Sequence, residues 1–217
     1  MKNLVKIIIA MATIASVGSA YAVGTLTLFD GTTTITVPDQ GSGDSNPAVG
    51  VVTFIGSIGV WNINVDTGTT KPAVIGQMDL AFLASATGAG TLTITFSDTG
   101  FGGLDNLLDV FGGTRATNAS ITDQILVNGV AVITLGPFGT GSTTFSGSGS
   151  ALGVDLSPSD VVSLVVTITE GTGGGLNSGD KNLGGLTVPD GGSAVALLGI
   201  ALTGIEAARR LFRARRA

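Results

Sequence analysis

Apolar and polar residues alternate along most of the chain, in short runs separated by Gly, Asp, Asn and Ser. In "GTLTITFSDTG", residues Leu92, Ile94 and Phe96 alternate with threonines. A period of two places one set of side chains on a buried face of a β-strand and the other set in solvent. Threonine suits the exposed face because its β-branched side chain fits a pleated surface. This pattern predicts an all-β protein.

Turn signals divide the alternating runs into separate strands. Asn128-Gly129 lies between two β-branched runs, and both residues tolerate the positive φ that a type I′ hairpin requires. The segment "LLDVF" at 107–111 fits either a strand or a helical turn. The other predicted strands cover residues 25–29, 33–37, 61–65, 91–96, 125–127, 130–135 and 161–170.

Eight to ten strands with regular turns predict an antiparallel β-sandwich, jelly-roll-like in form, over residues 23–170. A closed barrel or a β-solenoid is the alternative, although no repeat of fixed period is present. After Glu170 comes "GTGGGLNSGDKNLGGLT", in which seven of 17 residues are glycine and the apolar residues are isolated. This composition predicts a flexible linker over residues 171–187.

The first 22 residues have the three parts of a secretory signal peptide. Lys2 and Lys6 form a positive region, residues 4–17 are mostly apolar, and Ala20 and Ala22 form a small-residue cleavage site. We expect a helical signal at 1–22, cleavage after Ala22, and export of the mature chain.

Residues 188–217 combine a short motif, an apolar run and a basic cluster. The apolar run at 194–205 predicts a C-terminal transmembrane helix, which over residues 193–208 would rise about 24 Å against the ~30 Å of a bilayer core. A basic cluster at the end of this run fixes that end in the cytoplasm. The five arginines of this cluster are Arg209, Arg210, Arg213, Arg215 and Arg216. The helix is either a permanent anchor or part of a tail that is held briefly and then cut.

The order of these features resembles the PEP-CTERM class of sorting signals, and within it the VPDSG-CTERM variant. The motif residues are Val188, Pro189, Asp190, Gly191 and Gly192. Gly191 stands where the variant has serine. The same Val-Pro-Asp tripeptide occurs at 37–39, but neither an apolar run nor an arginine cluster follows it.

This resemblance implies recognition and cleavage by an exosortase-type membrane enzyme. It also implies transient anchoring in the inner membrane, followed by display at the cell surface or in an extracellular matrix. An association with extracellular polysaccharide or biofilm is a further implication of the resemblance.

The chain contains no histidine and no cysteine. This excludes Ser-His-Asp and Cys-His nucleophilic sites and His- or Cys-ligated zinc. Between residues 23 and 188 there are thirteen acidic and three basic residues, a balance that repels nucleic acid. We expect no enzymatic activity, no cofactor and no nucleic-acid partner.

Carboxylates are the remaining candidates for chemistry in the body. Asp98, Asp105 and Asp109 lie close together in sequence and are the candidate metal ligands or glycosidase acids. Their spacing matches no EF-hand loop. We favour the interpretation that Asp98 opens a turn and that Asp105 and Asp109 are solvated loop or cap residues. Trp61 could form a sugar-binding platform, but its alternating strand favours a place in the core.

These observations favour a non-enzymatic surface or matrix protein. Two alternatives remain at this point. One is a carbohydrate- or calcium-binding module permanently anchored by its C-terminal helix, and the other is a secreted hydrolase that uses a pair of carboxylates.

Overall fold

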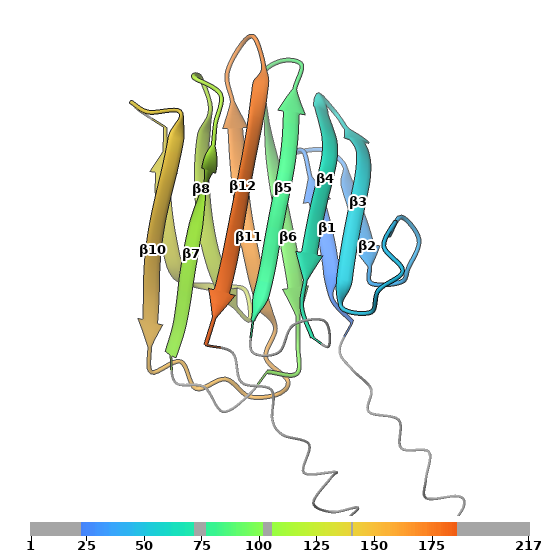
Figure 1. Cartoon of the computed structure of the whole chain (residues 1–217), viewed down its shortest axis with the longest axis vertical. Helices are drawn as coiled ribbons and strands as arrows, with labels where there is room; N and C mark the ends of the chain where they lie inside the picture. The colour runs from blue at the N-terminus through green and yellow to red at the C-terminus, as the bar shows by residue number, and fades with distance from the viewer. Residues whose placement is uncertain (1–22, 72–76, 102–105, 140, 186–217) are drawn as a thin grey trace, which may run out of the picture.

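The computed structural model describes residues 23–71, 77–101, 106–139 and 141–185. These residues form twelve strands in two six-stranded antiparallel sheets that pack face to face (Figure 1). Sheet A has the order β2-β1-β6-β11-β8-β9, and sheet B has the order β10-β7-β12-β5-β4-β3. The all-β antiparallel sandwich predicted from the alternation is confirmed.

The strands of sheet A are β1 Thr25–Phe29, β2 Thr34–Pro38, β6 Gly90–Asp98, β8 Ser120–Val127, β9 Val130–Phe138 and β11 Val162–Glu170. The strands of sheet B are β3 Val51–Ile58, β4 Trp61–Thr69, β5 Met78–Ala86, β7 Asn106–Thr114, β10 Thr144–Leu152 and β12 Gly175–Gly184.

Strands β5 to β12 follow the strand order of an eight-stranded jelly roll. Sheet B contributes β5-β12-β7-β10 and sheet A contributes β6-β11-β8-β9, with the chain passing repeatedly between the sheets. The hairpin β1–β2 extends sheet A beside β6, and the hairpin β3–β4 extends sheet B beside β5. The predicted jelly-roll form therefore holds for the eight strands β5 to β12.

The alternation of side chains places the core between the sheets. On β6, Leu92, Ile94 and Phe96 are buried, while Thr91 and Thr93 lie on the outer face of sheet A. Trp61 on β4 is 1% exposed, which places it in the core as favoured and excludes it as an exposed sugar platform. At the β8–β9 turn, Asn128 and Gly129 have φ of 51° and 79°, as the predicted hairpin requires.

The prediction of a linker at 171–187 is wrong for most of its length. Residues 175–184 form β12, which lies between β7 and β5 in the middle of sheet B. Its inward-facing residues are Asn177, Gly179, Lys181 and Leu183, all buried. Three of these four are polar or glycine, so the strand lacks the apolar periodicity by which strands such as β6 were predicted. The segment 107–111, which was ambiguous in sequence, belongs to strand β7.

The first residue of β1 and the last residue of β12 lie at the same end of the sandwich, called here the terminal end (Figure 1). The predicted signal helix and C-terminal helix, the motif at 188–192 and the arginine cluster lie outside the described residues. Within the described ranges, no helix is long and apolar enough to span a membrane.

Candidate functional site

A lysine and two aspartates meet in the core between the two sheets. Lys181 lies on β12 and Asp109 on the neighbouring strand β7, whereas Asp123 comes from β8 in the opposite sheet. The Lys181 Nζ contacts Asp123 Oδ1, donates a 2.9 Å hydrogen bond to the Gln124 carbonyl, and lies 3.7 Å from Asp109 Oδ2. All three charged side chains are 0% exposed. We call these three residues the inter-sheet triad.

The surroundings of the inter-sheet triad are apolar. Lys181 faces Phe111 and Leu80 on its neighbouring strands, and Asp123 faces Val166 and Leu135. The Phe111 ring lies 5.0 Å from the ring of Phe145 and 6.4 Å from that of Phe82, so aromatic groups also lie close by. Charged groups in apolar surroundings have lost their hydrating water, and few protein dipoles replace its stabilising effect.

Burial shifts the pKa values of two residues of the triad, Asp109 and Lys181, away from their charged forms. Burial, and then contact with the Asp123 carboxyl group, raises the pKa of Asp109 to about 8. Burial also lowers the pKa of Lys181, although the two aspartates oppose this change. Asp109 Oδ1 and Oδ2 and Asp123 Oδ2 have no hydrogen-bond partner in the described part of the chain. The triad is thus an unusually poorly solvated group of ionisable side chains.

A second buried ion pair lies at the terminal end. Lys71 Nζ is 2.7 Å from Asp98 Oδ2, which also accepts a 2.8 Å hydrogen bond from Thr70 Oγ1. The other carboxylate oxygen, Asp98 Oδ1, accepts a 2.7 Å hydrogen bond from the Thr99 amide. Lys71 Nζ also donates a hydrogen bond to the Thr99 carbonyl. The Lys71 ammonium lies 4.0 Å from the centre of the Phe101 ring. Each charged group of this pair therefore has polar partners in addition to the opposite charge.

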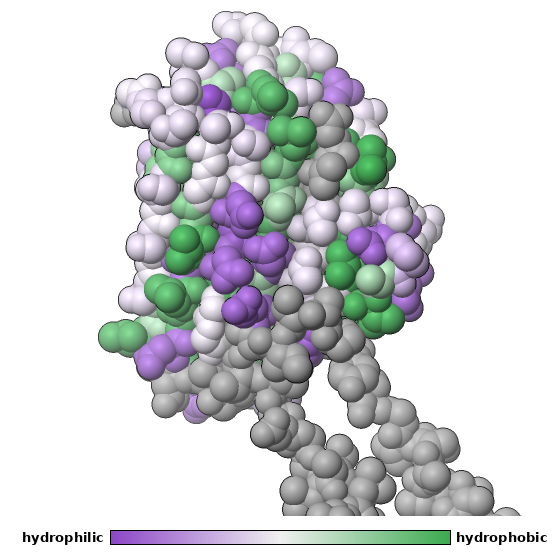
Figure 2. Space-filling view, in the orientation of Figure 1, coloured by the Kyte–Doolittle hydropathy of each residue, from purple (hydrophilic) through white to green (hydrophobic). Residues whose placement is uncertain are grey.

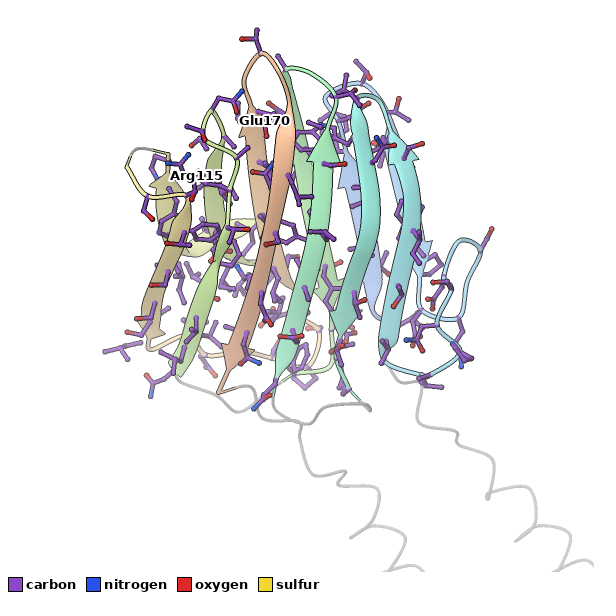
Figure 3. The ribbon with its side chains drawn as sticks, turned by 45° about the horizontal axis from the view of Figure 1, so that its top comes forward. Arg115 and Glu170 are labelled. Carbon is purple, nitrogen blue, oxygen red and sulfur yellow. The ribbon has the colours of Figure 1, made fainter. Side chains whose placement is uncertain are left out.

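A third polar cluster lies at the opposite end, where Figure 3 labels Arg115 and Glu170. Arg115 donates through one terminal nitrogen to the carbonyls of Ala116, Thr117 and Ala119 at 2.9–3.1 Å. It therefore stabilises the turn between β7 and β8. Arg115 and Glu170 are 4% and 3% exposed.

All three basic residues of the body are therefore buried. Lys71, Arg115 and Lys181 are the only lysines and arginines between residues 23 and 188, and none is more than 5% exposed. The formal charge on the surface of the body is consequently negative. The scarcity of basic residues in the sequence was a signal that each one has a specific partner, but the partners lie far away along the chain.

A polar patch lies on the outer face of sheet B (Figure 2). Asp180 on β12 is exposed, and the register places Asn182 directly opposite Asp79 on β5. Burial, and then the negative charge of Asp180, raises the pKa of Asp79 to about 6. Leu108 and Val110 on β7 are about half exposed beside this patch.

The three candidate aspartates do not form one site. Asp98 ends β6 of sheet A and pairs with Lys71, which follows β4 of sheet B. Asp109 belongs to the inter-sheet triad, and Asp105 lies outside the described residues. The interpretation of Asp109 as a solvated loop or cap residue is wrong, because it is buried within strand β7. Asp98, which was expected to open a turn, is the last residue of β6 and is also buried. No group of three acidic side chains in the described ranges has the arrangement of a metal site.

The comparison with protein-family models identifies the C-terminal tail. Residues 187–212 match the family model of the VPDSG-CTERM motif, so the predicted PEP-CTERM-type sorting tail is confirmed. This motif implies an exported protein that is directed to the cell surface. No curated protein matches the chain.

Solved structures similar to this chain include carbohydrate-binding modules. TmCBM61, solved with β-1,4-galactotriose, has 11% identity and a TM-score of 0.36 over 59% of this chain and 90% of its own. A family 35 module from Clostridium thermocellum has 15% identity and a TM-score of 0.33 over 61% and 96%. A module of the β-sandwich superfamily described as promiscuous in specificity has 13% identity and a TM-score of 0.35 over 78% and 86%.

Proposed function

We propose that this chain is a non-enzymatic surface or matrix protein whose jelly-roll body is delivered through its C-terminal tail. An exosortase-type membrane enzyme would recognise Val188–Gly192 and cut the tail there, while the apolar run holds the precursor in the membrane. The observation that carries this proposal is the sorting motif, whose match begins at residue 187, directly after a body that extends to Gly185.

The geometry of the body supports this arrangement. Strand β12 ends at Gly184 in the centre of sheet B, so only residues 185–187 separate a central strand from the motif. Strand β1 begins at the same terminal end. A body held by either terminus would therefore present the terminal end to the membrane and its other end to the outside.

The experiment is the intact mass of the protein recovered from the surface of its own host. We expect a chain that begins at Val23 and ends between Val188 and Gly192, with or without an attached group. A chain that runs to Ala217 would contradict the proposal and favour a permanent anchor.

A matched pair of variants tests the motif itself. Pro189→Ala should prevent processing, so that the uncut precursor accumulates in the membrane fraction. Pro38→Ala changes the same tripeptide at the end of the edge strand β2, where no apolar run follows, and should leave processing unchanged. If both variants are processed equally, Val188-Pro189-Asp190 is not part of the recognition site.

We propose extracellular polysaccharide as the matrix partner. Because the exposed formal charges of the body are negative, an anionic polymer would be repelled unless cations bridge the two. The polar patch of Asp79, Asp180 and Asn182 offers hydrogen-bonding groups on an open sheet face. Co-sedimentation with polysaccharide from the host, with and without calcium, tests this. Binding that Asp180→Ala leaves unchanged would exclude this face.

A further inference from the structure

The inter-sheet triad places an amine, a carboxyl carbon and a second carboxyl group together in a dry core. We propose that Lys181 Nζ and Asp123 Cγ become joined by an intramolecular isopeptide bond, with Asp109 carrying the proton during the reaction. The product would be a covalent link between strand β12 of sheet B and strand β8 of sheet A.

The positions of strands β12 and β8 bring the two reacting side chains within reach of each other. Two packed sheets lie about 10 Å apart, and a lysine side chain together with an aspartate spans that distance. Lys181 already contacts Asp123 Oδ1, and its hydrogen bond of 2.9 Å to the Gln124 carbonyl directs the amine toward β8. Both partners lie within strands that have a paired neighbour on each side, so the reacting atoms are held in place by the fold.

The environment favours the neutral forms that the reaction needs. An amine attacks only when it has lost its extra proton, and a carboxyl group loses water most readily when it is protonated. Burial among apolar side chains lowers the pKa of Lys181 and raises the pKa of Asp109 to about 8, so a proton can pass from the Lys181 amine to the Asp109 carboxyl group, which then serves as the proton carrier. The core also excludes the water that would favour hydrolysis of the amide.

Formation of the amide needs no reactant other than the Lys181 amine and the Asp123 carboxyl group. The Nζ lone pair attacks Cγ of Asp123, and a carbon–nitrogen bond forms. Asp109, whose Oδ2 lies 3.7 Å from Nζ, accepts a proton from the nitrogen and delivers a proton to the leaving oxygen of Asp123. The carbon–oxygen bond breaks, one water leaves, and Asp109 returns to its starting state. Two buried charged groups are thereby replaced by one neutral amide.

The Lys71–Asp98 pair provides a control within the same chain. It is also buried, but both oxygens of its carboxylate are occupied by hydrogen bonds, from Thr70 Oγ1 and from the Thr99 amide. Within the described ranges, Asp98 is the one carboxylate that pairs with Lys71, so a second carboxyl group to carry the proton is lacking. We expect this pair to remain an ordinary ion pair.

A link between Lys181 and Asp123 would close a loop across 58 positions of the chain. Cross-linking two distant residues removes conformational freedom from the unfolded chain. The link would also fasten the strand that precedes the sorting motif. A force applied through the C-terminus would then reach sheet A through a covalent bond, which suits a protein held or attached by its tail.

Trypsin digestion of the denatured full-length protein tests the proposal, because the body has only two trypsin sites, after Arg115 and after Lys181. Cleavage is expected after Arg115 but not after Lys181, since an acylated lysine is not a trypsin site; Lys71 is not cut in either case because it precedes Pro72. The fragment 116–209 should appear, lighter by one water than its sequence mass, and fragmentation should place the link between Lys181 and Asp123. A chain that is cut after Lys181 to give 116–181 at full mass would overturn the proposal.

Two further results separate the roles of the residues. Asp109→Asn should fold with the same circular dichroism spectrum but keep its full mass and be cut after Lys181, because the proton carrier is missing. A link in this variant at wild-type yield would overturn the role of Asp109. A loss of water mapped to any site other than Lys181 and Asp123 would overturn the assignment of the bond. Because the wild-type digest is decisive alone, the proposal stays testable even if Asp109→Asn fails to fold.

Discussion

Asn177 and Glu170 join the two sheets by a hydrogen bond of 2.8 Å from Asn177 Nδ2 to Glu170 Oε2. The two residues are seven positions apart, but Glu170 ends β11 in sheet A and Asn177 lies on β12 in sheet B. Asn177 Oδ1 also accepts a 2.9 Å hydrogen bond from the Ala116 amide. One buried amide therefore connects both sheets and the turn that Arg115 stabilises.

Asn177→Ala should lower the free energy of unfolding by about 2–4 kcal/mol, because it leaves the Glu170 carboxylate and the Ala116 amide buried without a partner. Urea denaturation monitored by Trp61 fluorescence measures the change. Glu170→Gln is the matched control, since its amide oxygen can still accept from Asn177, and it should cost less than about 1 kcal/mol. Equal losses in the two variants would show that the carboxylate charge is essential.

Lys71→Met should be among the most destabilising single changes in the body. It leaves the Asp98 carboxylate 3% exposed and without its counter-charge, at a cost of about 3–5 kcal/mol. The double variant Lys71→Met/Asp98→Leu removes both charges and should recover most of this loss. Denaturation of the two variants measures the difference, and a double variant no more stable than Lys71→Met would contradict this account.

Gly179→Ala tests the close packing of β12 against its neighbours. A Cβ at this position would lie 2.5 Å from Phe82 Cε1 and 2.9 Å from Phe111 Cε2, so the aromatic rings must move. We expect a loss of about 1–3 kcal/mol in the free energy of unfolding. Gly88→Ala is the control, because nothing lies within 4 Å of the new Cβ, and it should be neutral or stabilising by about 0.4–1 kcal/mol.

Apolar periodicity predicted strands such as β6, but β12 was not predicted, and neither were β3, β5 and β10. On β6 the inward positions are Leu92, Ile94 and Phe96, so periodicity alone identifies the buried face. On β12 the inward positions include Gly179 and Lys181, whose places depend on Phe82 and Asp123. These partners lie about a hundred and about sixty positions earlier in the chain, and no local pattern contains that information.

The same reason explains why the buried clusters were missed. Asp98 and Asp109 are close in sequence and were grouped on that basis, but the chain passes from sheet A to sheet B between them. Each therefore pairs with a different lysine. The sorting tail was predictable because its motif, apolar run and arginines are consecutive, and it needs no tertiary contact to be recognised.

The polar patch on sheet B predicts a pH dependence of stability with a defined sign. The folded-state pKa of Asp79 is raised from 3.8 to about 6, so the folded protein binds more protons than the unfolded chain between these values. Stability should fall as the pH rises through this range. Asp79→Asn removes the effect, so its Tm should exceed that of the wild type at pH 7 but not at pH 4. Because the patch is partly solvated, we expect a gain of only about 1–2 °C.

Asp30→Asn supplies a control of the opposite sign. Hydrogen bonds from the Thr33 and Thr32 amides lower the pKa of Asp30, whose Oδ1 lies 2.6 Å and 2.9 Å from these nitrogens in the β1–β2 turn. The ionised carboxylate therefore contributes stability at neutral pH that is lost as the pH falls through the folded-state pKa. Asp30→Asn should have a lower Tm than the wild type at pH 7, with a smaller difference in acid. If both variants shift the Tm in the same direction at pH 7, the raised pKa of Asp79 is not the cause of its effect.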